Sequence, residues 1–200
     1  GQVSNAPSGT FSQLSSGPYH SCGIQTSGEI QCWGYDVNGE VSNTPSGTFS
    51  HLSSGAYHIC GINTSGGVEC WGKDGYNQVS NTPSGTFISL TAGFQHTCGI
   101  KTSGEIQCWG YDFYNQVSNV PSGSFTTLSS GREHVCGIRT SGEIQCWGYN
   151  AYNQVSDTPS GFFTTLSSGR YYSCGIKTSG EIQCWGDDQA NQVSDAPSGS

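Results

Sequence analysis

The chain has 200 residues, of which 32% are hydrophobic, and it contains 30 Gly, 10 Cys and no Met. A sequence this poor in apolar residues buries little hydrophobic surface, and secreted proteins commonly supplement such cores with disulfides. Its net charge is −8, with only six Lys and Arg. The composition therefore argues against a basic nucleic-acid interface, and the lack of a run of about 20 apolar residues argues against membrane insertion.

One motif organises the whole chain. The stretch "HSCGIQTSGEIQCWG" (20–34) recurs four more times, and its two cysteines and its tryptophan each recur at an interval of 38 residues. Such a period indicates a row of supersecondary units within one repeat domain over residues 1–200. The predicted units are 1–38, 39–76, 77–114, 115–152 and 153–190. Residues 191–200 copy residues 1–10, and we expect them to begin a further unit or to complete the edge of another molecule.

Within the first unit, the predicted elements are all strands and turns. "QVSN" (2–5) is typical of a short outer strand, and a Pro-Ser-Gly turn follows it. "TFSQLSSG" (10–17) predicts a strand that ends in a Gly turn, and a hairpin and the polar loop "YDVNG" (35–39) follow. Helical periodicity is missing, and Gly or Pro interrupts the chain about every ten residues. The prediction is an all-β fold with four short strands per unit, the size of a propeller blade.

The hairpin places the two cysteines of each unit opposite one another. A three-residue loop over 26–28 puts Gly28 at the position that favours a left-handed conformation. Counting outward from this loop pairs Ile24 with Ile30 and Cys22 with Cys32, close enough for a disulfide. The predicted pairs are Cys22–Cys32, Cys60–Cys70, Cys98–Cys108, Cys136–Cys146 and Cys174–Cys184.

Two other uses of the cysteines are weaker alternatives. Zinc sites usually place cysteines two to four residues apart and need four ligands, whereas these pairs are ten residues apart. A redox pair of the thioredoxin type needs C-x-x-C, which is missing. We therefore predict structural disulfides and no metal, with reduced thiols remaining as an alternative. The same hairpin register puts Gly23 and Trp33 on one face, where we expect Gly23 to make room for the indole.

The combined motif resembles a known family. The pattern G-x-x-H-S-C-G-I-x-T-S-G-E-I-Q-C-W-G-x-D-x-x-N-Q is similar to the repeat of the regulator-of-chromosome-condensation β-propellers, and most similar to secreted bacterial members and plant receptor ectodomains. All five copies carry this resemblance. It implies a ring of antiparallel blades around an axis, each carrying here a hairpin disulfide. Rings of this family usually have seven blades, whereas this chain supplies five units.

Ligand-binding candidates come from the positions that vary among the copies. Variation is concentrated in the two residues after "SSG" (or "TAG") and the four residues after "WG", where Tyr and Asp are frequent. Loops on a fixed scaffold carry recognition, although exposed loops also vary without any role. The candidates are Tyr19, Tyr35, Asp36, Tyr57, Tyr76, Phe94, Tyr111, Phe113, Tyr114, Arg132, Tyr149, Tyr152, Arg170 and Tyr171.

Several polar positions have structural interpretations. A repeated His slot (His20, His58, His96 and His134) is expected to bond a backbone carbonyl in its own blade rather than to form a metal ring. Asp36 and its equivalents are expected to form Asx-turns rather than calcium sites. Asn63-Thr64-Ser65 is a glycosylation sequon if the source is eukaryotic.

The sequence predicts no catalytic residues and no cofactor, because a site made of repeated residues would have to operate five times. The predicted function is a secreted, non-enzymatic building block at the cell exterior that assembles head-to-tail, including into filaments, through residues 191–200. The alternative is an extracellular module that binds a protein or a glycan through its variable Tyr- and Asp-rich loops.

Overall fold

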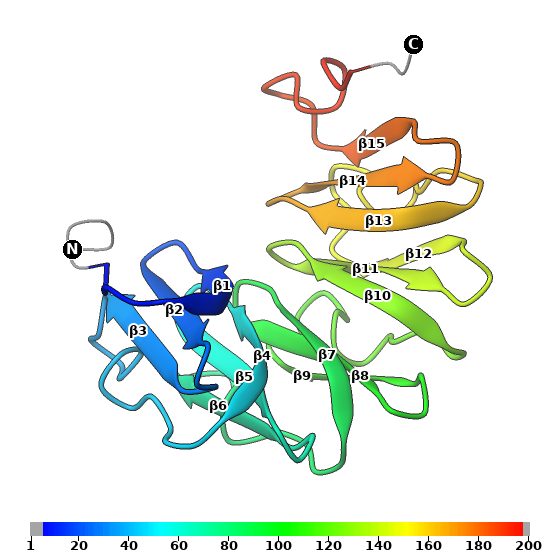
Figure 1. Cartoon of the computed structure of the whole chain (residues 1–200). Coiled ribbons are helices and arrows are strands. Elements are labelled where there is room, and N and C mark those ends of the chain that lie inside the picture. The colour runs from blue at the N-terminus through cyan, green and yellow to red at the C-terminus, as the bar shows by residue number, and fades with distance from the viewer. Residues whose placement is uncertain (1–5, 198–200) are drawn as a thin grey trace.

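Fifteen strands form five three-stranded sheets in the computed structural model, which describes residues 6–197 (Figure 1). None of the described segments forms a helix able to cross a membrane. The strands are β1 (Phe11–Ser16), β2 (His20–Gln25), β3 (Ile30–Gly34), β4 (Phe49–Ser54), β5 (His58–Asn63), β6 (Val68–Gly72), β7 (Phe87–Ala92), β8 (His96–Lys101), β9 (Ile106–Gly110), β10 (Phe125–Ser130), β11 (His134–Arg139), β12 (Ile144–Gly148), β13 (Phe163–Ser168), β14 (Tyr172–Lys177) and β15 (Ile182–Gly186).

Each sheet is one antiparallel blade, and its hairpin has the predicted register. In the first blade β2 lies between β1 and β3, with Cys22 opposite Cys32 and Ile24 opposite Ile30. Gly28 has φ 91° and its N–H donates to the carbonyl of Gln25 at 2.8 Å, which closes the three-residue loop. All five predicted disulfides are present, with Cα–Cα distances of 4.0–4.1 Å. The all-β, disulfide-paired blade is therefore confirmed.

The expected fourth strand does not form. Its first copy (2–5) lies outside the described residues, but the equivalent segments, such as 40–43, are turns. The physical reason is the preceding Asp36, whose Oδ1 accepts hydrogen bonds from Val41 N at 2.8 Å and Ser42 N at 2.9 Å. These amide groups are therefore engaged within the turn and are not available for a β-ladder. Residues 191–197 repeat this turn, with Asn191 at φ 59°.

Blades pack face to face through two different surfaces. The face that carries the disulfide and Ile24 contacts Phe49 and Leu52 on the inner strand of the next blade, and both of these are at most 3% exposed. Full burial of each such side chain contributes about 1.5–3 kcal/mol. The opposite face of a blade brings its Phe and Leu over the glycine of the middle strand. A Cβ on Gly23 would lie 2.6 Å from the Phe11 ring, so this glycine makes room for phenylalanine rather than for the tryptophan that we expected.

The tryptophan instead joins its blade to the connection that precedes it. Trp71 is 4% exposed and its Nε1 donates to the carbonyl of Glu40 at 3.0 Å. The same hydrogen bond recurs from Trp109, Trp147 and Trp185 at 3.0–3.1 Å.

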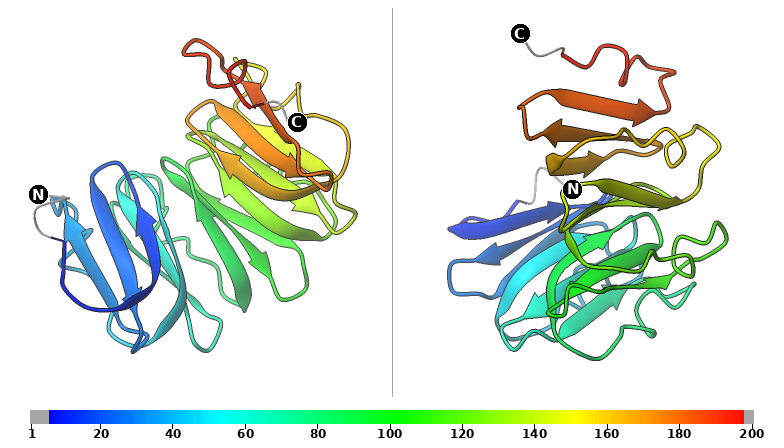
Figure 2. Two further views of the ribbon diagram at one scale, coloured as in Figure 1. Left: turned by 45° about the horizontal axis from the view of Figure 1, so that its top comes forward. Right: turned by 90° about the vertical axis from the view of Figure 1, so that its right-hand side faces the viewer.

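The five blades follow an arc, and the first and last blades lie apart (Figures 1 and 2). Leu14 of the first blade is 64% exposed, whereas its equivalent Leu52 is 2% exposed. At the other end, Ile176 is 37% exposed, whereas Ile24 in the same slot is 2% exposed. The described residues thus form an open ring with one apolar face uncovered at each end.

The disulfides should contribute measurably to stability because the blades have small cores. Replacing Cys98 and Cys108 together with Ala should lower the free energy of unfolding by about 2–3 kcal/mol through the gain in entropy of the unfolded chain. Guanidinium denaturation monitored by tryptophan fluorescence measures this change. Under reducing conditions the wild type and the variant should have the same free energy of unfolding. If the oxidised variant has the same denaturation midpoint as the oxidised wild type, the prediction is contradicted.

Candidate functional site

The two variable segments of each unit meet at one end of the blades. Since β1 ends where β3 also ends in the antiparallel sheet, Tyr19 and Tyr35 become neighbours, and Tyr35 N donates to Tyr19 O at 2.9 Å. The same backbone bond joins the segments in the other blades, from Lys73 to Tyr57, Tyr111 to Gln95, Tyr149 to Glu133 and Asp187 to Tyr171. The fourteen candidate residues therefore lie at the same end of the propeller, which we call the aromatic face.

Aromatic rings on this face contact one another across blade boundaries. In the first three blades, Tyr19 stacks on Tyr57 with ring centroids 5.2 Å apart, and Tyr35 lies 5.9 Å from Tyr19. Tyr57 in turn meets Phe94 edge-on at 5.8 Å. Rings of three different blades therefore form one continuous cluster.

A second cluster extends through the later blades. Tyr76 contacts Tyr111 at 4.8 Å, and Tyr114 contacts Tyr149 at 4.6 Å. Phe113 joins it through Tyr114, and Tyr152 stacks on Tyr171 at 4.9 Å. Both clusters together contain every aromatic candidate that the sequence singled out: Tyr19, Tyr35, Tyr57, Tyr76, Phe94, Tyr111, Phe113, Tyr114, Tyr149, Tyr152 and Tyr171.

Three cations lie over these rings. The guanidinium carbon of Arg132 is 4.4 Å from the Phe94 centroid, and that of Arg170 is 4.9 Å from the Tyr171 centroid. Lys73 Nζ lies 5.1 Å from the Tyr57 centroid. Such contacts contribute about 0.5–1 kcal/mol at exposed sites. Lys73 was not among the candidates, although its position in a variable segment could have indicated it.

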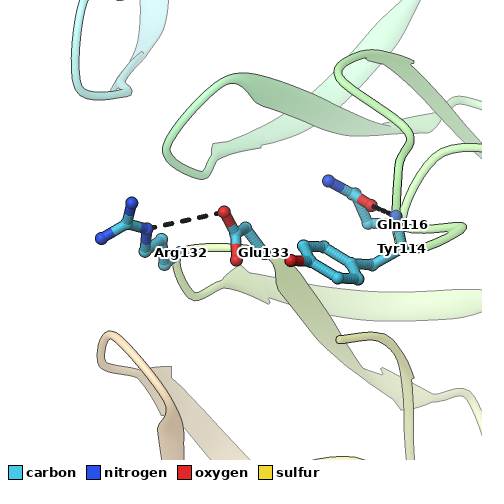
Figure 3. A network of polar contacts seen from close by, with 4 residues as sticks. All are labelled: Tyr114, Gln116, Arg132 and Glu133. Carbon is cyan, nitrogen blue, oxygen red and sulfur yellow. Dashed lines mark hydrogen bonds and ion pairs between the residues drawn. The ribbon is translucent and has the colours of Figure 1, made fainter. Parts of the chain in front are cut away.

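A local hydrogen bond and an ion pair hold the loops that carry the rings. In Figure 3, Tyr114 N donates to Oε1 of the buried Gln116 at 2.9 Å, and Arg132 Nε lies 3.6 Å from Glu133 Oε1. Burial raises the pKa of the Tyr111 hydroxyl, and the nearby negative charge of Glu133 raises it further. The Tyr111 hydroxyl therefore remains protonated at neutral pH and is a donor as well as an acceptor.

The carboxylate of the candidate Asp36 is used within the fold. Hydrogen bonds from the backbone of Ser42 and Val41 lower the pKa of Asp36. The equivalent Asn150 accepts the same bonds from Val155 N at 2.8 Å and Ser156 N at 3.0 Å, without a charge. Because a neutral amide replaces the carboxylate, this slot works as a turn cap.

A central opening of about 650 Å³ lies inside the aromatic face. It is lined by the ends of the inner strands, by the glycine turns and by the residue after each glycine, namely Pro18, Ala56, Phe94, Arg132 and Arg170. The glycines are needed because a Cβ on Gly55 would lie 2.6 Å from the Gly93 carbonyl oxygen of the next blade. Successive turns are linked by backbone hydrogen bonds, with Ala56 N donating to Phe94 O at 3.2 Å and Phe94 N to Arg132 O at 3.0 Å.

The histidines of the repeated slot are buried beside these turns. His58 Nε2 lies 2.8 Å from Thr97 Oγ1 of the next blade, and His134 Nε2 lies 3.0 Å from Ser173 Oγ. These bonds join neighbouring blades, whereas we expected a backbone carbonyl of the same blade. Burial lowers the pKa of His58 to about 4 and that of His96 to about 3. Both imidazoles are therefore neutral at pH 7.

The three-stranded, face-packed blades around an opening define a repeat β-propeller. The chain belongs to the regulator of chromosome condensation (RCC1) repeat family, whose family model matches residues 11–40, 87–116, 125–154 and 163–192, more than half of the chain. A search of curated proteins found no match.

Solved structures of the same fold include two plant receptor ectodomains. The Physcomitrella patens receptor kinase CR4 ectodomain is 30% identical with a TM-score of 0.77, over 88% of this chain and 50% of that one. The Arabidopsis thaliana ACR4 ectodomain is 26% identical with a TM-score of 0.75, over 88% of this chain and 68% of that one. Saccharomyces cerevisiae Prp20p, 16% identical with a TM-score of 0.76 over 90% of this chain and 58% of its own, shares the fold. The chain thus spans half the length of the CR4 ectodomain.

The buried histidines should make stability depend on pH. An unfolded chain takes up protons on histidine below about pH 6.5, whereas folded His58 and His96 stay neutral until about pH 4 and 3. The unfolded state therefore binds more protons in this window, and the free energy of unfolding should fall as the pH is lowered from 7 to 5. Urea denaturation across this range should show a smaller fall for His96→Gln than for the wild type. Equal pH dependence of the two proteins would contradict this explanation.

Proposed function

We propose that this chain is an extracellular, non-enzymatic binding module that recognises a protein or a glycan through its aromatic face. The observation that carries this proposal is the contact of aromatic side chains from neighbouring blades at a single end of the propeller. The rings belong to loops that vary among otherwise nearly identical repeats. The blades therefore share one scaffold, and each blade contributes different side chains to the aromatic face.

Exposure of these rings supports an intermolecular role. Phe113 is 74% exposed, Tyr76 45% and Tyr19 40%, although each lies in a cluster with other rings. Clustered exposed aromatic residues mark interaction sites in soluble proteins, because tyrosine offers apolar contact area together with a hydroxyl. Such a surface suits both protein and carbohydrate ligands.

The relatives support the same proposal. Two of them are ectodomains of plant receptor kinases, and Prp20p was described with binding properties to Gsp1p and histones. Proteins of this fold thus include ectodomains and a protein with described binding partners. Five disulfides in a 200-residue chain favour an oxidising, extracellular location.

Two matched phenylalanine substitutions test the aromatic face. Phe113→Ala removes an exposed ring of the face, and Phe162→Ala removes a 56% exposed ring at the hairpin end, near Gly142. On a glycan array and on a panel of purified extracellular proteins, Phe113→Ala should weaken binding about tenfold, while Phe162→Ala should retain wild-type binding. Equal binding by both variants, or loss of binding only in Phe162→Ala, would refute the assignment.

A second candidate function is self-assembly, favoured by the two uncovered blade faces. The first blade presents the Phe and Leu face with Leu14, and the last blade presents the Ile face with Ile176 and Ile182, which are the two halves of the interface repeated inside the molecule. Their polar groups also match. Inside the chain Ser54 N donates to Ser15 Oγ of the preceding blade at 2.8 Å. The last blade offers Ser167 in the acceptor slot, and the first offers Ser16 in the donor slot.

Such a contact between blades of two copies would be head-to-tail and would build rings or filaments. Static light scattering should show particles heavier than the 21.1 kDa chain, and Leu14→Ser should return the mass to that of one chain. Ile88→Ser alters a 59% exposed side chain away from either end face and should leave the mass unchanged. A wild type that stays at 21.1 kDa at millimolar concentration would exclude self-assembly. In a separate experiment, deletion of residues 191–200 tests whether this segment contributes to the assembly. An unchanged particle mass would show that it does not.

A further inference from the structure

The rim of the central opening is chemically uneven. The residue after each turn glycine is apolar in the first three blades (Pro18, Ala56 and Phe94) and arginine in the last two (Arg132 and Arg170). Two of the six cations of an acidic chain therefore line one half of a single opening. The residue that follows also varies among the blades, as Tyr19, Tyr57, Gln95, Glu133 and Tyr171.

Backbone contacts hold the two arginines in register. Arg132 N donates to Arg170 O at 3.1 Å, in the same series of hydrogen bonds that links the other turns. Each guanidinium also lies over an aromatic ring, Phe94 for Arg132 and Tyr171 for Arg170. A guanidinium that lies over a ring still has N–H groups on its edge, and these are suited to a carboxylate.

Neither arginine is fully used by the fold. Arg132 Nε lies 3.6 Å from Glu133 Oε1, beyond ordinary hydrogen-bond length, and in residues 6–197 no ion pair to Arg170 is found. Arg139, at the hairpin end, provides the contrast. Its guanidinium donates to the Ser122 carbonyl at 3.1 Å and to Gln145, and it lies over Phe125. Arg139 thus has a structural role, whereas Arg132 and Arg170 retain donors for a ligand.

The groups of the aromatic face that can contact a ligand are mainly aromatic rings and side-chain hydrogen-bond donors, and less the backbone amides. The amide groups of Ala56, Phe94 and Arg132 are bonded to neighbouring turns, and those of Tyr35 and Tyr111 are bonded within their blades. Recognition of a peptide through its main chain, which needs free amide and carbonyl groups, is therefore disfavoured. A polymer of sugar rings can instead place its apolar ring faces on tyrosine and its polar groups on hydroxyls and guanidinium groups.

We propose that the arginine half of the opening binds the carboxylates of an acidic, uronate-containing polysaccharide whose sugar rings lie on the aromatic face. This inference rests on the binding role proposed for that face and names its ligand class. Arg132 and Arg170 each pair with a carboxylate, and the neighbouring Phe94 and Tyr171 rings border the sugars. Each pairing is a charge-assisted hydrogen bond at the rim of the opening.

Calorimetry with an oligomer of galacturonic acid tests the proposal, with its methyl ester as the uncharged control ligand. The acid should bind the full chain, and its methyl ester should bind at least tenfold more weakly. Arg132→Gln and Arg170→Gln should each weaken binding of the acid about 10- to 100-fold. Lys177→Gln changes the net charge equally at the hairpin end of β14 and should retain wild-type affinity.

Three results would overturn the inference. They are equal binding of acid and ester, equal affinities of the Arg170→Gln and Lys177→Gln proteins, or tighter and Arg170-dependent binding of a poly-glutamate peptide. If a glycan or protein ligand still depends on Phe113 but not on Arg132 or Arg170, the aromatic face keeps its proposed function and only the carboxylate assignment fails. Circular dichroism of each variant confirms that the chain remains folded.

Discussion

The packing of one blade on the next is the constraint on which the rest of the structure depends. Each interface joins the disulfide face of one blade to the Phe and Leu of the following inner strand, as Cys22 and Ile24 do with Phe49 and Leu52. A three-stranded sheet cannot bury both of its faces alone, so every blade obtains its core from its neighbours. The disulfide fits this role because it fills the interface and fixes the hairpin with few residues.

The same constraint explains which residues are constant. The turn glycines are fixed because the carbonyl of the next turn occupies the space of a side chain, and the middle-strand glycines are fixed because Phe and Leu of the inner strand lie over them. The buried His58 and His134 join blades through Thr97 and Ser173. The residues beyond the turns differ among the copies, and these residues form the aromatic face.

Much of this architecture was predictable from the 38-residue period. The hairpin register followed from the position of Gly28, and this register required Cys22 to face Cys32. The fourth strand was predicted wrongly because "QVSN" has strand-like composition, whereas its equivalents are held in turns by a carboxylate or amide from the preceding loop, as Asp36 holds residues 41 and 42. Side-chain capping of a distant amide is not visible in hydrophobic periodicity.

The sequence by itself determined the blade, its disulfide and the positions that vary, because these depend on contacts within 38 residues. Only the tertiary structure decided what lies between blades: that His58 bonds Thr97, and that the five described blades form an open arc. It also brought Tyr114 and Tyr149 into contact and placed Arg132 over Phe94. These pairs come from different repeats, and the angle between successive blades, which no local pattern encodes, sets their distances.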